Sequence, residues 1–122
     1  MENVINWFEI PASDFRRAVS FYKAVLGLDI QETEMFGTKM GLFPSDGTNV
    51  SGAIVQGDDY QPSTDGVVAY LNGGNNLQSV LDKVESNQGK VIVPKTQISP
   101  EMGYFGMFID TEGNKMAVHS IQ

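Results

Sequence analysis

Apolar side chains recur at helical spacing between residues 15 and 26. They stand one helical turn apart, on one face of a helix, at Phe15, Ala18, Val19, Tyr22, Val25 and Leu26. Ser13 or Asp14 can cap the first turn, and Gly27 can end the last turn in a left-handed conformation. The pattern predicts an amphipathic helix with Tyr22 in the core. Arg16, Arg17 and Lys23 fall on its outer face and are expected to be solvated charges.

Segments rich in β-branched and aromatic residues surround this helix. They predict strands over residues 4–10, 28–34, 38–43 and 50–56, separated by glycine-containing turns. Residues 57–66 then form the most loop-like segment of the chain. After it the order returns: a strand over 67–71, a cap at Asn75 or Asn76, a helix with an apolar face, an end at Gly89, and further strands. The apolar face of this second helix consists of Leu77, Val80, Leu81 and Val84.

The two halves match at one offset. Adding 62 to the numbers of Ser13, Phe15 and Gly27 gives Asn75, Leu77 and Gly89. The repeat predicts an α+β fold with two tandem βαβββ modules, whose mixed, mainly antiparallel sheets form a cleft. The expected organisation is a single domain over 1–122, with one module over about 1–57, a connector over about 58–66 and a second module over about 67–122. Either two open sheet faces within the chain or a dimer would enclose the cavity.

The last two predicted strands form a hairpin around the turn at residues 110–114. Gly113 is expected to adopt a positive φ in this turn. Side chains of the return strand alternate between faces, so that Met116 and Val118 point to the core and Ala117 and His119 point the other way. His119 is the only histidine of the chain.

Composition narrows the classes of function. The chain has 122 residues, a net charge of −7 and no cysteine. The acidic balance argues against a nucleic-acid partner, which needs a cationic surface. The lack of cysteine excludes disulfides and thiolate chemistry. No apolar run has membrane-spanning length and the N-terminus does not resemble a signal peptide, so a cytoplasmic protein with no membrane partner is expected.

Two motifs carry a resemblance to a known family. The helix over 14–27, entered from the segment Phe8-Glu-Ile-Pro11, resembles the first helix of the vicinal oxygen chelate superfamily, the glyoxalase and bleomycin-resistance group. The segment Asp110-Thr-Glu-Gly-Asn114 is similar to that family's Asp-Pro-Asp-Gly-Asn turn before its last strand. The resemblance covers essentially the whole chain and implies the paired-module fold. It leaves function open, because the family includes lyases, isomerases, dioxygenases and antibiotic-sequestering proteins.

The resemblance also implies where a divalent metal would be held. Enzymes of the family use His, Glu or Gln side chains on the first and fourth strands of each module, and the metal acts as a Lewis acid. The corresponding positions here are Trp7, residues 51–53, Val67 and Ala117, none of which supplies a usual metal ligand. We therefore expect no cofactor. A divalent metal remains the alternative, in an all-oxygen site that includes Glu9 and suits Mg²⁺, Ca²⁺ or Mn²⁺.

The remaining residues of the predicted cleft suit a small organic ligand. Glu9 and His119 are the candidate catalytic acid and base. The candidate ligand-binding residues are Trp7, Ser51, Ala69, Leu71, Tyr104 and Ala117, with Met35 and Phe36 at the rim. Structural alternatives are backbone hydrogen bonds for Glu9, a satisfied and partly exposed His119, and a Trp7 that fills the core between the sheets.

Two functions follow from these residues. The first is a metal-free protein that binds a small organic ligand in the inter-sheet cleft, as a homodimer. The second is a divergent enzyme, a glyoxalase-like lyase, an isomerase or a dioxygenase, that uses a metal or acid–base chemistry of Glu9 and His119.

Overall fold

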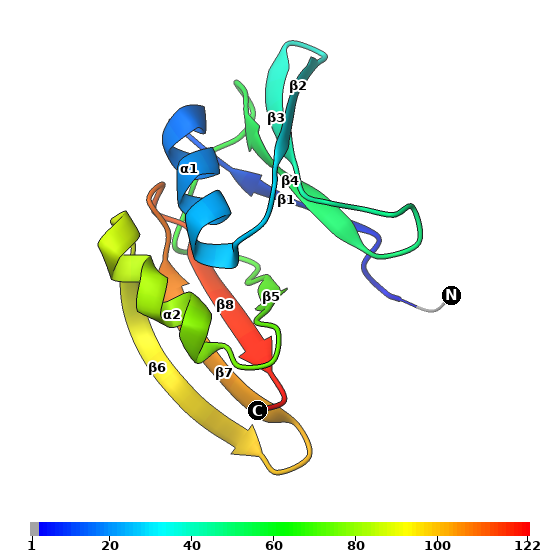
Figure 1. Ribbon diagram of the computed structural model, residues 1–122. Coiled ribbons are helices and arrows are strands. Elements are labelled where there is room, and N and C mark those ends of the chain that lie inside the picture. Colours follow the sequence, from blue (N-terminus) through cyan, green and yellow to red (C-terminus); the bar gives the residue numbers. More distant parts are fainter. Residues whose placement is uncertain (1–2) are drawn as a thin grey trace.

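The computed structural model describes residues 3–122. Two modules follow one another along the chain, each with a strand, a helix and three further strands (Figure 1). The first contains β1 (Trp7–Pro11), α1 (Phe15–Leu26), β2 (Gln31–Met35), β3 (Thr38–Leu42) and β4 (Ser51–Gln56). The second contains β5 (Tyr70–Asn72), α2 (Gln78–Val84), the 3₁₀ turn η1 (Glu85–Asn87), β6 (Lys90–Ser99), β7 (Gly103–Ile109) and β8 (Lys115–Ser120).

Each module forms one four-stranded sheet. Sheet A has the order β1-β4-β3-β2 and sheet B the order β5-β8-β7-β6. In both sheets the first strand pairs in parallel with the last, and the other pairs are antiparallel. This confirms the predicted α+β architecture of two mixed, mainly antiparallel sheets.

The first helix forms where local signals predicted it. Asp14 is its N-cap, with a side chain that accepts a hydrogen bond from the backbone N–H of Arg17 at 3.1 Å. Gly27 ends the helix at φ 67°, the left-handed conformation that glycine adopts without a steric penalty.

The second helix begins and ends differently from the prediction. Its first position is capped from a distance, because the Ser120 hydroxyl accepts a hydrogen bond from the N–H of Leu77 at 2.9 Å. The Asn76 side chain accepts hydrogen bonds from the N–H of Gln78 and from the Lys95 ammonium group. The left-handed residue at its end is Gln88, with φ 75°, so the prediction for Gly89 is wrong. A Cβ at Gly89 would lie 2.8 Å from both the Ile109 carbonyl and the Phe21 ring, so packing requires this glycine.

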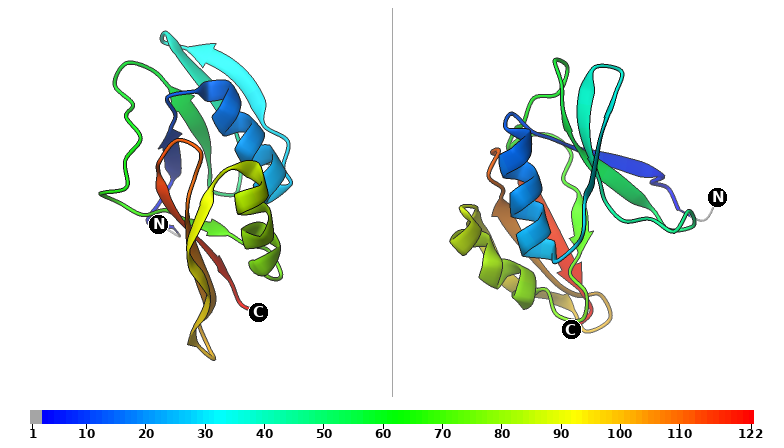
Figure 2. Two further views of the ribbon diagram at one scale, coloured as in Figure 1. Left: turned by 90° about the vertical axis from the view of Figure 1, so that its left-hand side faces the viewer. Right: turned by 45° about the horizontal axis from the view of Figure 1, so that its top comes forward.

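The two modules share one core on the side of the sheets that carries the helices. Both helices lie at the left of Figure 1 and remain side by side in the two views of Figure 2. Phe21 of α1 packs against Phe108 of β7, with ring centroids 5.9 Å apart. We call this the helix face of each sheet and the opposite side the open face. Neither helix within residues 3–122 has the length and apolar character needed to cross a membrane.

The turn at residues 110–114 joins the modules on the helix face. Glu112 accepts hydrogen bonds from the N–H groups of Ser13 and Asp14, and its carboxylate pairs with Arg17 at 2.7 Å. The Tyr22 hydroxyl donates to Asp110 at 2.6 Å. Arg17 is therefore part of the junction between modules, which corrects the expectation of a solvated charge.

Candidate functional site

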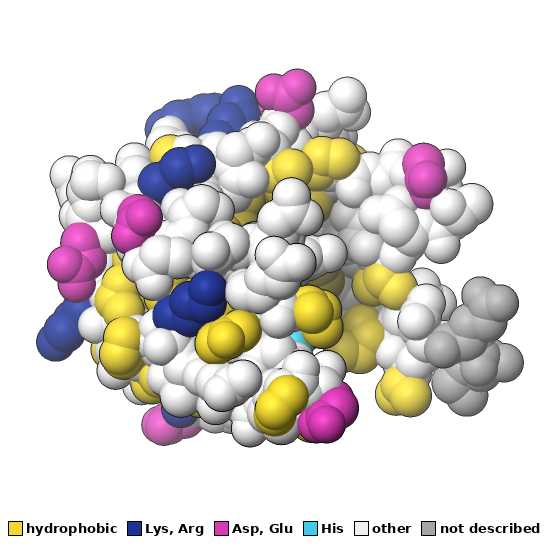
Figure 3. Space-filling view, turned by 60° about the horizontal axis from the view of Figure 1, so that its bottom comes forward, with side chains coloured by type: hydrophobic (Ala, Val, Ile, Leu, Met, Phe, Trp, Pro, Cys, Tyr) yellow, Lys and Arg dark blue, Asp and Glu magenta, His cyan; other side chains and the backbone are white. Residues whose placement is uncertain are grey.

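Two hollows meet at strand β5. The larger, the inter-module groove, has a volume of about 1120 Å³ and extends between the end of α1, helix α2 and the edge strands of the two sheets. The smaller, the His119 hollow, has a volume of about 850 Å³ and lies beside β5 and β8. The volume of the smaller hollow lies within the range of small-molecule sites, about 300–1,000 Å³, and that of the larger slightly exceeds it. In Figure 3 apolar side chains flank a furrow in the surface, and the single histidine is visible at its edge.

The inter-module groove has an apolar floor and an amide-rich lining. The floor is formed by Phe8, Val25, Leu26, Phe43, Leu71 and Val80. Asn49, Asn72, Asn75 and Asn76 also line the groove, and Lys83 is the charged residue of the lining. Amides that can both donate and accept hydrogen bonds, above an apolar floor, suit a neutral or weakly polar organic molecule.

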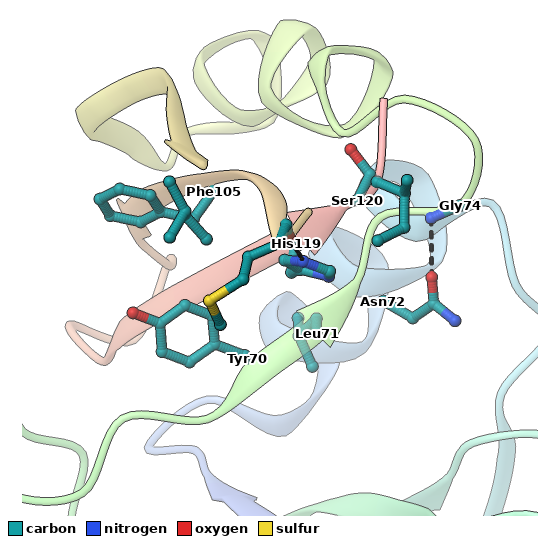
Figure 4. Close-up of a pocket in the computed structure, with 10 residues that line it drawn as sticks. Tyr70, Leu71, Asn72, Gly74, Phe105, His119 and Ser120 are labelled. Carbon is teal, nitrogen blue, oxygen red and sulfur yellow. Dashed lines mark hydrogen bonds between the residues drawn. The ribbon is translucent and has the colours of Figure 1, made fainter. Parts of the chain in front are cut away.

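The His119 hollow gathers aromatic side chains around one imidazole. The rings of Tyr70 and Phe105 are 6.5 Å apart, on one side of His119, and Asn72 lies on the other side (Figure 4). His119 Nε2 is 2.6 Å from the carbonyl oxygen of Met102. A carbonyl only accepts hydrogen bonds, so Nε2 is the donor, and Nδ1 of the neutral ring is an acceptor.

The register of β5 differs from the one expected from the sequence, which assigned Ala69 and Leu71 to the cleft. Tyr70 pairs with Ala117 and Asn72 with His119, so these four side chains share the open face of sheet B. Leu71 points to the helix face and belongs to the core. A shift of one residue along a strand exchanges its two faces. Val67 lies before β5 and is 99% exposed. It therefore does not occupy the metal-ligand position on a strand that the resemblance implied for it.

The predicted ligand-binding residues are distributed over several surroundings. Ser51, Ala69 and Leu71 line the inter-module groove. The Ser51 hydroxyl donates to the carbonyls of Phe43 and Pro44, at 3.3 and 3.1 Å. Ala117 is fully buried. Tyr104 packs against the core on the helix face, beneath the Lys95 ammonium group at 4.6 Å from its ring centroid.

Glu9 and His119, the predicted acid and base, lie on different sheets. Glu9 belongs to β1, where it accepts hydrogen bonds from Tyr60 at 2.8 Å and from Trp7 at 3.3 Å. His119 belongs to β8 and bonds to Met102. No hydrogen bond joins Glu9 to His119 within residues 3–122. Their role as catalytic acid and base stays a prediction.

Several residues of these sites escaped the sequence analysis. Tyr70 and Phe105 become visible only once the pairing of β5, β7 and β8 is known. Tyr60 lies in the connector, 51 residues from Glu9, and no local pattern links the two. One local signal did point to Phe105. Side chains alternate between the two faces of β7, so Phe105 lies on the face opposite to the buried residues Gly106 and Phe108.

The residues present do not fit the divalent metal that the family's enzymes hold. Within residues 3–122 no three side chains of His, Asp or Glu gather in a way that could bind a metal ion. The strand positions of Trp7, Ser51 and Ala117 carry an indole, a hydroxyl that bonds to backbone carbonyls, and a methyl group. A site with fewer than three such ligands would bind a divalent ion weakly.

Comparison with known proteins shows the family. The model of the Glyoxalase/Bleomycin resistance protein/Dioxygenase superfamily matches residues 4–118. A glyoxylase-like domain-containing protein from Didymella fabae is 28% identical over 124 aligned residues, which cover 93% of this chain and 91% of the relative.

Solved structures share the fold. A glyoxylase/bleomycin resistance protein/dioxygenase domain from Frankia sp. EAN1pec has a TM-score of 0.70 at 11% identity, with 98% of each chain covered. TnmS3, an antibiotic binding protein from Streptomyces sp. CB03234, has a TM-score of 0.65 at 19% identity, covering 97% of this chain and 95% of its own. These structures show the fold, and the matched family model over residues 4–118 shows that the chain belongs to the Glyoxalase/Bleomycin resistance protein/Dioxygenase superfamily.

Proposed function

We propose that this protein binds a small organic ligand in the inter-module groove and does so without a catalytic metal. The observation that carries the proposal is the groove itself, with its volume of about 1120 Å³, its apolar floor and the asparagines of its lining. TnmS3, an antibiotic binding protein, has the same fold, which supports a binding role for such a scaffold. The donor set supports the metal-free form, since no three potential ligands gather within residues 3–122.

A ligand screen tests the binding role. Compounds with apolar rings and one or two polar groups are added to the purified protein and scored by thermal shift. A ligand present at a hundred times its Kd stabilises the folded state by about 2.7 kcal/mol. A screen in which no compound raises the melting temperature would contradict the proposal.

A pair of variants on α2 tests the location of a hit. Ser79 is exposed and lines the groove, so Ser79→Trp should fill part of it and weaken binding. Asp82 is exposed on the same helix but does not line the groove, so Asp82→Trp is the matched control. A compound that binds both variants equally, measured by calorimetry, would show that the ligand lies elsewhere.

Metal content tests the metal-free form. Protein purified without a histidine tag is offered Zn²⁺, Ni²⁺, Mn²⁺ and Fe²⁺ in turn, and bound metal is measured by plasma mass spectrometry. We expect far less than one metal ion per chain and no thermal shift. Near-stoichiometric metal would instead support the divergent enzyme, with Glu9 as the first ligand to substitute.

We also propose that the protein is a homodimer. The contacts between modules lie on the helix face, which leaves the open faces of both sheets available to a second copy. The open face of sheet A carries the half-exposed side chain of Trp7, and that of sheet B carries the half-exposed side chain of Tyr70. A two-fold axis would set each open face of one copy opposite the other open face of its partner, so that two equivalent cavities would form between them.

Analytical ultracentrifugation tests the dimer. Tyr70 is 54% exposed on the open face of sheet B, so Tyr70→Glu should shift the protein toward monomer. Val67 is 99% exposed and lies outside both sheets, so Val67→Glu is the control. A wild-type protein that sediments as a monomer at all concentrations tested would refute the dimer.

A further inference from the structure

The open face of sheet A carries one charged side chain. Alternation along β1 places Trp7 and Glu9 on this face, and the registers of β4, β3 and β2 add only uncharged side chains to it. The two salt bridges found within residues 3–122 join other residues, Arg16 with Glu32 and Arg17 with Glu112. The Glu9 carboxylate thus has no cationic partner among the described side chains.

Two aromatic side chains hold this carboxylate in place. The Trp7 indole N–H donates to one oxygen of Glu9 at 3.3 Å, and the Tyr60 hydroxyl donates to the other at 2.8 Å. Both donors are neutral, so they orient the carboxylate without cancelling its charge, and each oxygen retains further acceptor capacity. Trp7 is 45% exposed and accessible to a solute.

The combination of a free carboxylate and two electron-rich rings suits an organic ammonium ion. The faces of indole and phenol rings attract cations, and the carboxylate adds direct charge attraction. Asp58 and Asp59 directly precede Tyr60 and increase the local negative charge. A divalent metal is a poorer match, because aromatic rings do not ligate it and one carboxylate is too few.

We propose that Trp7, Glu9 and Tyr60 form a recognition site for small organic ammonium cations on the open face of sheet A. The simpler alternative is that the hydrogen bond from Tyr60 only ties the connector to β1. A glutamine at position 9 would serve that purpose as well as a glutamate, so the two alternatives differ in their need for charge. None of the three residues lines either hollow, and the proposal is independent of the ligand site in the inter-module groove.

The intrinsic fluorescence of the protein reports on this site directly, because Trp7 is the only tryptophan. The wild-type protein is titrated with choline and with tetramethylammonium, and in parallel with 3,3-dimethyl-1-butanol, the uncharged analogue of choline. Sodium chloride at matched concentration controls for ionic strength. We expect a saturable change in emission with both ammonium ions and no saturable change with the alcohol or the salt. An equal response to the alcohol, or no response to either cation, would overturn the proposal.

Three variants separate charge from structure. Glu9→Gln removes the charge but keeps an acceptor oxygen for the Tyr60 hydroxyl, and it should weaken choline binding at least tenfold. Tyr60→Phe retains the ring but loses the hydrogen bond to Glu9, and we expect a smaller loss. Glu34→Gln removes one charge from the opposite face of the same sheet and should leave binding unchanged.

Circular dichroism and the free-protein emission spectrum establish that each variant is folded. If Glu9→Gln binds choline as well as the wild type does, the hydrogen bonds among Trp7, Glu9 and Tyr60 serve only to hold the connector against β1, and the proposal is overturned. If Glu9→Gln fails to fold, Tyr60→Phe decides the question: weakened choline binding supports the site, and unchanged binding overturns it.

Discussion

Polar side chains on the helix face and on the open faces differ in burial and in hydrogen bonding. At the module junction on the helix face, Asp110 and Asn114 are buried and fully bonded, and the Glu112 carboxylate has no exposed surface. Within residues 3–122 no buried side-chain nitrogen or oxygen lacks a partner. On the open faces, by contrast, Trp7 and Tyr70 are about half exposed and Glu9 has no counter-ion among the described residues.

This difference separates folding from binding. Asp110 and Glu112 belong to the turn that resembles a family motif, yet donors of both modules take up their lone pairs. They are poor candidates for chemistry, because a ligand would have to displace several hydrogen bonds. Glu9 and His119 retain free acceptor capacity on the open faces, where a ligand or a partner can reach them. The predictions below test this division in terms of stability.

The largest effect is expected for Asp110→Ala at the junction. The Asp110 carboxylate is 4% exposed and accepts hydrogen bonds from Tyr22, from the N–H groups of Glu112 and Asn114, and from the Asn114 amide. The substitution leaves these donors unpaired in the core. It should cost about 3 kcal/mol or more of unfolding free energy, measured by urea denaturation. A loss below about 1 kcal/mol, the worth of a single exposed bond, would mean that the junction is not a cooperative unit.

A smaller effect, with a pH signature, is expected for Glu112→Gln. Burial raises the pKa of Glu112, but hydrogen bonds from Arg17, the Asp14 N–H and Thr111 outweigh it, so the pKa falls from its ordinary 4.5 to about 2. Because the folded-state pKa is the lower one, the ionised carboxylate stabilises the fold above pH 4.5 and loses this effect as the pH falls toward 2. The wild type should exceed the variant by roughly 2 kcal/mol at pH 7, with the difference shrinking across that interval.

The control for this pH dependence is Glu32→Gln. Glu32 forms the other salt bridge, with Arg16, whose side chain is 66% exposed. Solvent screens an exposed pair, so the curve of unfolding free energy against pH should stay close to that of the wild type. A difference at Glu112 that is independent of pH would contradict the role of its charge.

A loss of about 1–2 kcal/mol is expected for Ser120→Ala. Ser120 is 3% exposed, and its hydroxyl satisfies the N–H of Leu77 at the start of α2. Amide hydrogen exchange should show the first turn of α2 opening more readily, while α1, which has its own cap in Asp14, is unaffected. Equal loosening of both helices would point to a global effect instead.

The smallest effect on stability is expected for Glu9→Gln on the open face. Its side chain is exposed and the substitution keeps an acceptor for Tyr60, so the free energy of unfolding should change by less than about 0.5 kcal/mol. Denaturation of the variant in parallel with Asp110→Ala makes the contrast direct. A large loss of stability in Glu9→Gln would mean that this carboxylate stabilises the fold, as the buried polar residues of the module junction do.

The elements that were predicted well carry their signals within a few residues. Helix α1 has its cap, apolar face and terminal glycine in one stretch, and all three are found, although the buried face also includes Phe21, which the pattern did not predict. Met116 and Val118 are buried in the core, and Gly113 adopts φ 94°. The errors occur where the other module takes part. Gly89 resembles a helix end in sequence, but its lack of a side chain serves contact with Phe21, which lies 68 positions earlier by number.

The candidate site depends even more on distant contacts. Trp7 and Glu9, both assigned to the predicted cleft, do share one face of β1, because alternation along a strand is a local pattern. It failed at β5, where the start of the strand at Tyr70 decides which residues share a face with His119.

By itself the sequence determined the order of the elements, the two-module repeat, the first helix and the family resemblance, since periodicity, caps and turn residues act over short distances. Only the tertiary structure decided that Ser120 caps the second helix, that Glu112 binds Arg17, and that Tyr60 lies against Glu9. These contacts join residues that are far apart in the chain, and their partners are selected by the packing of the two modules around one core, which no local pattern encodes.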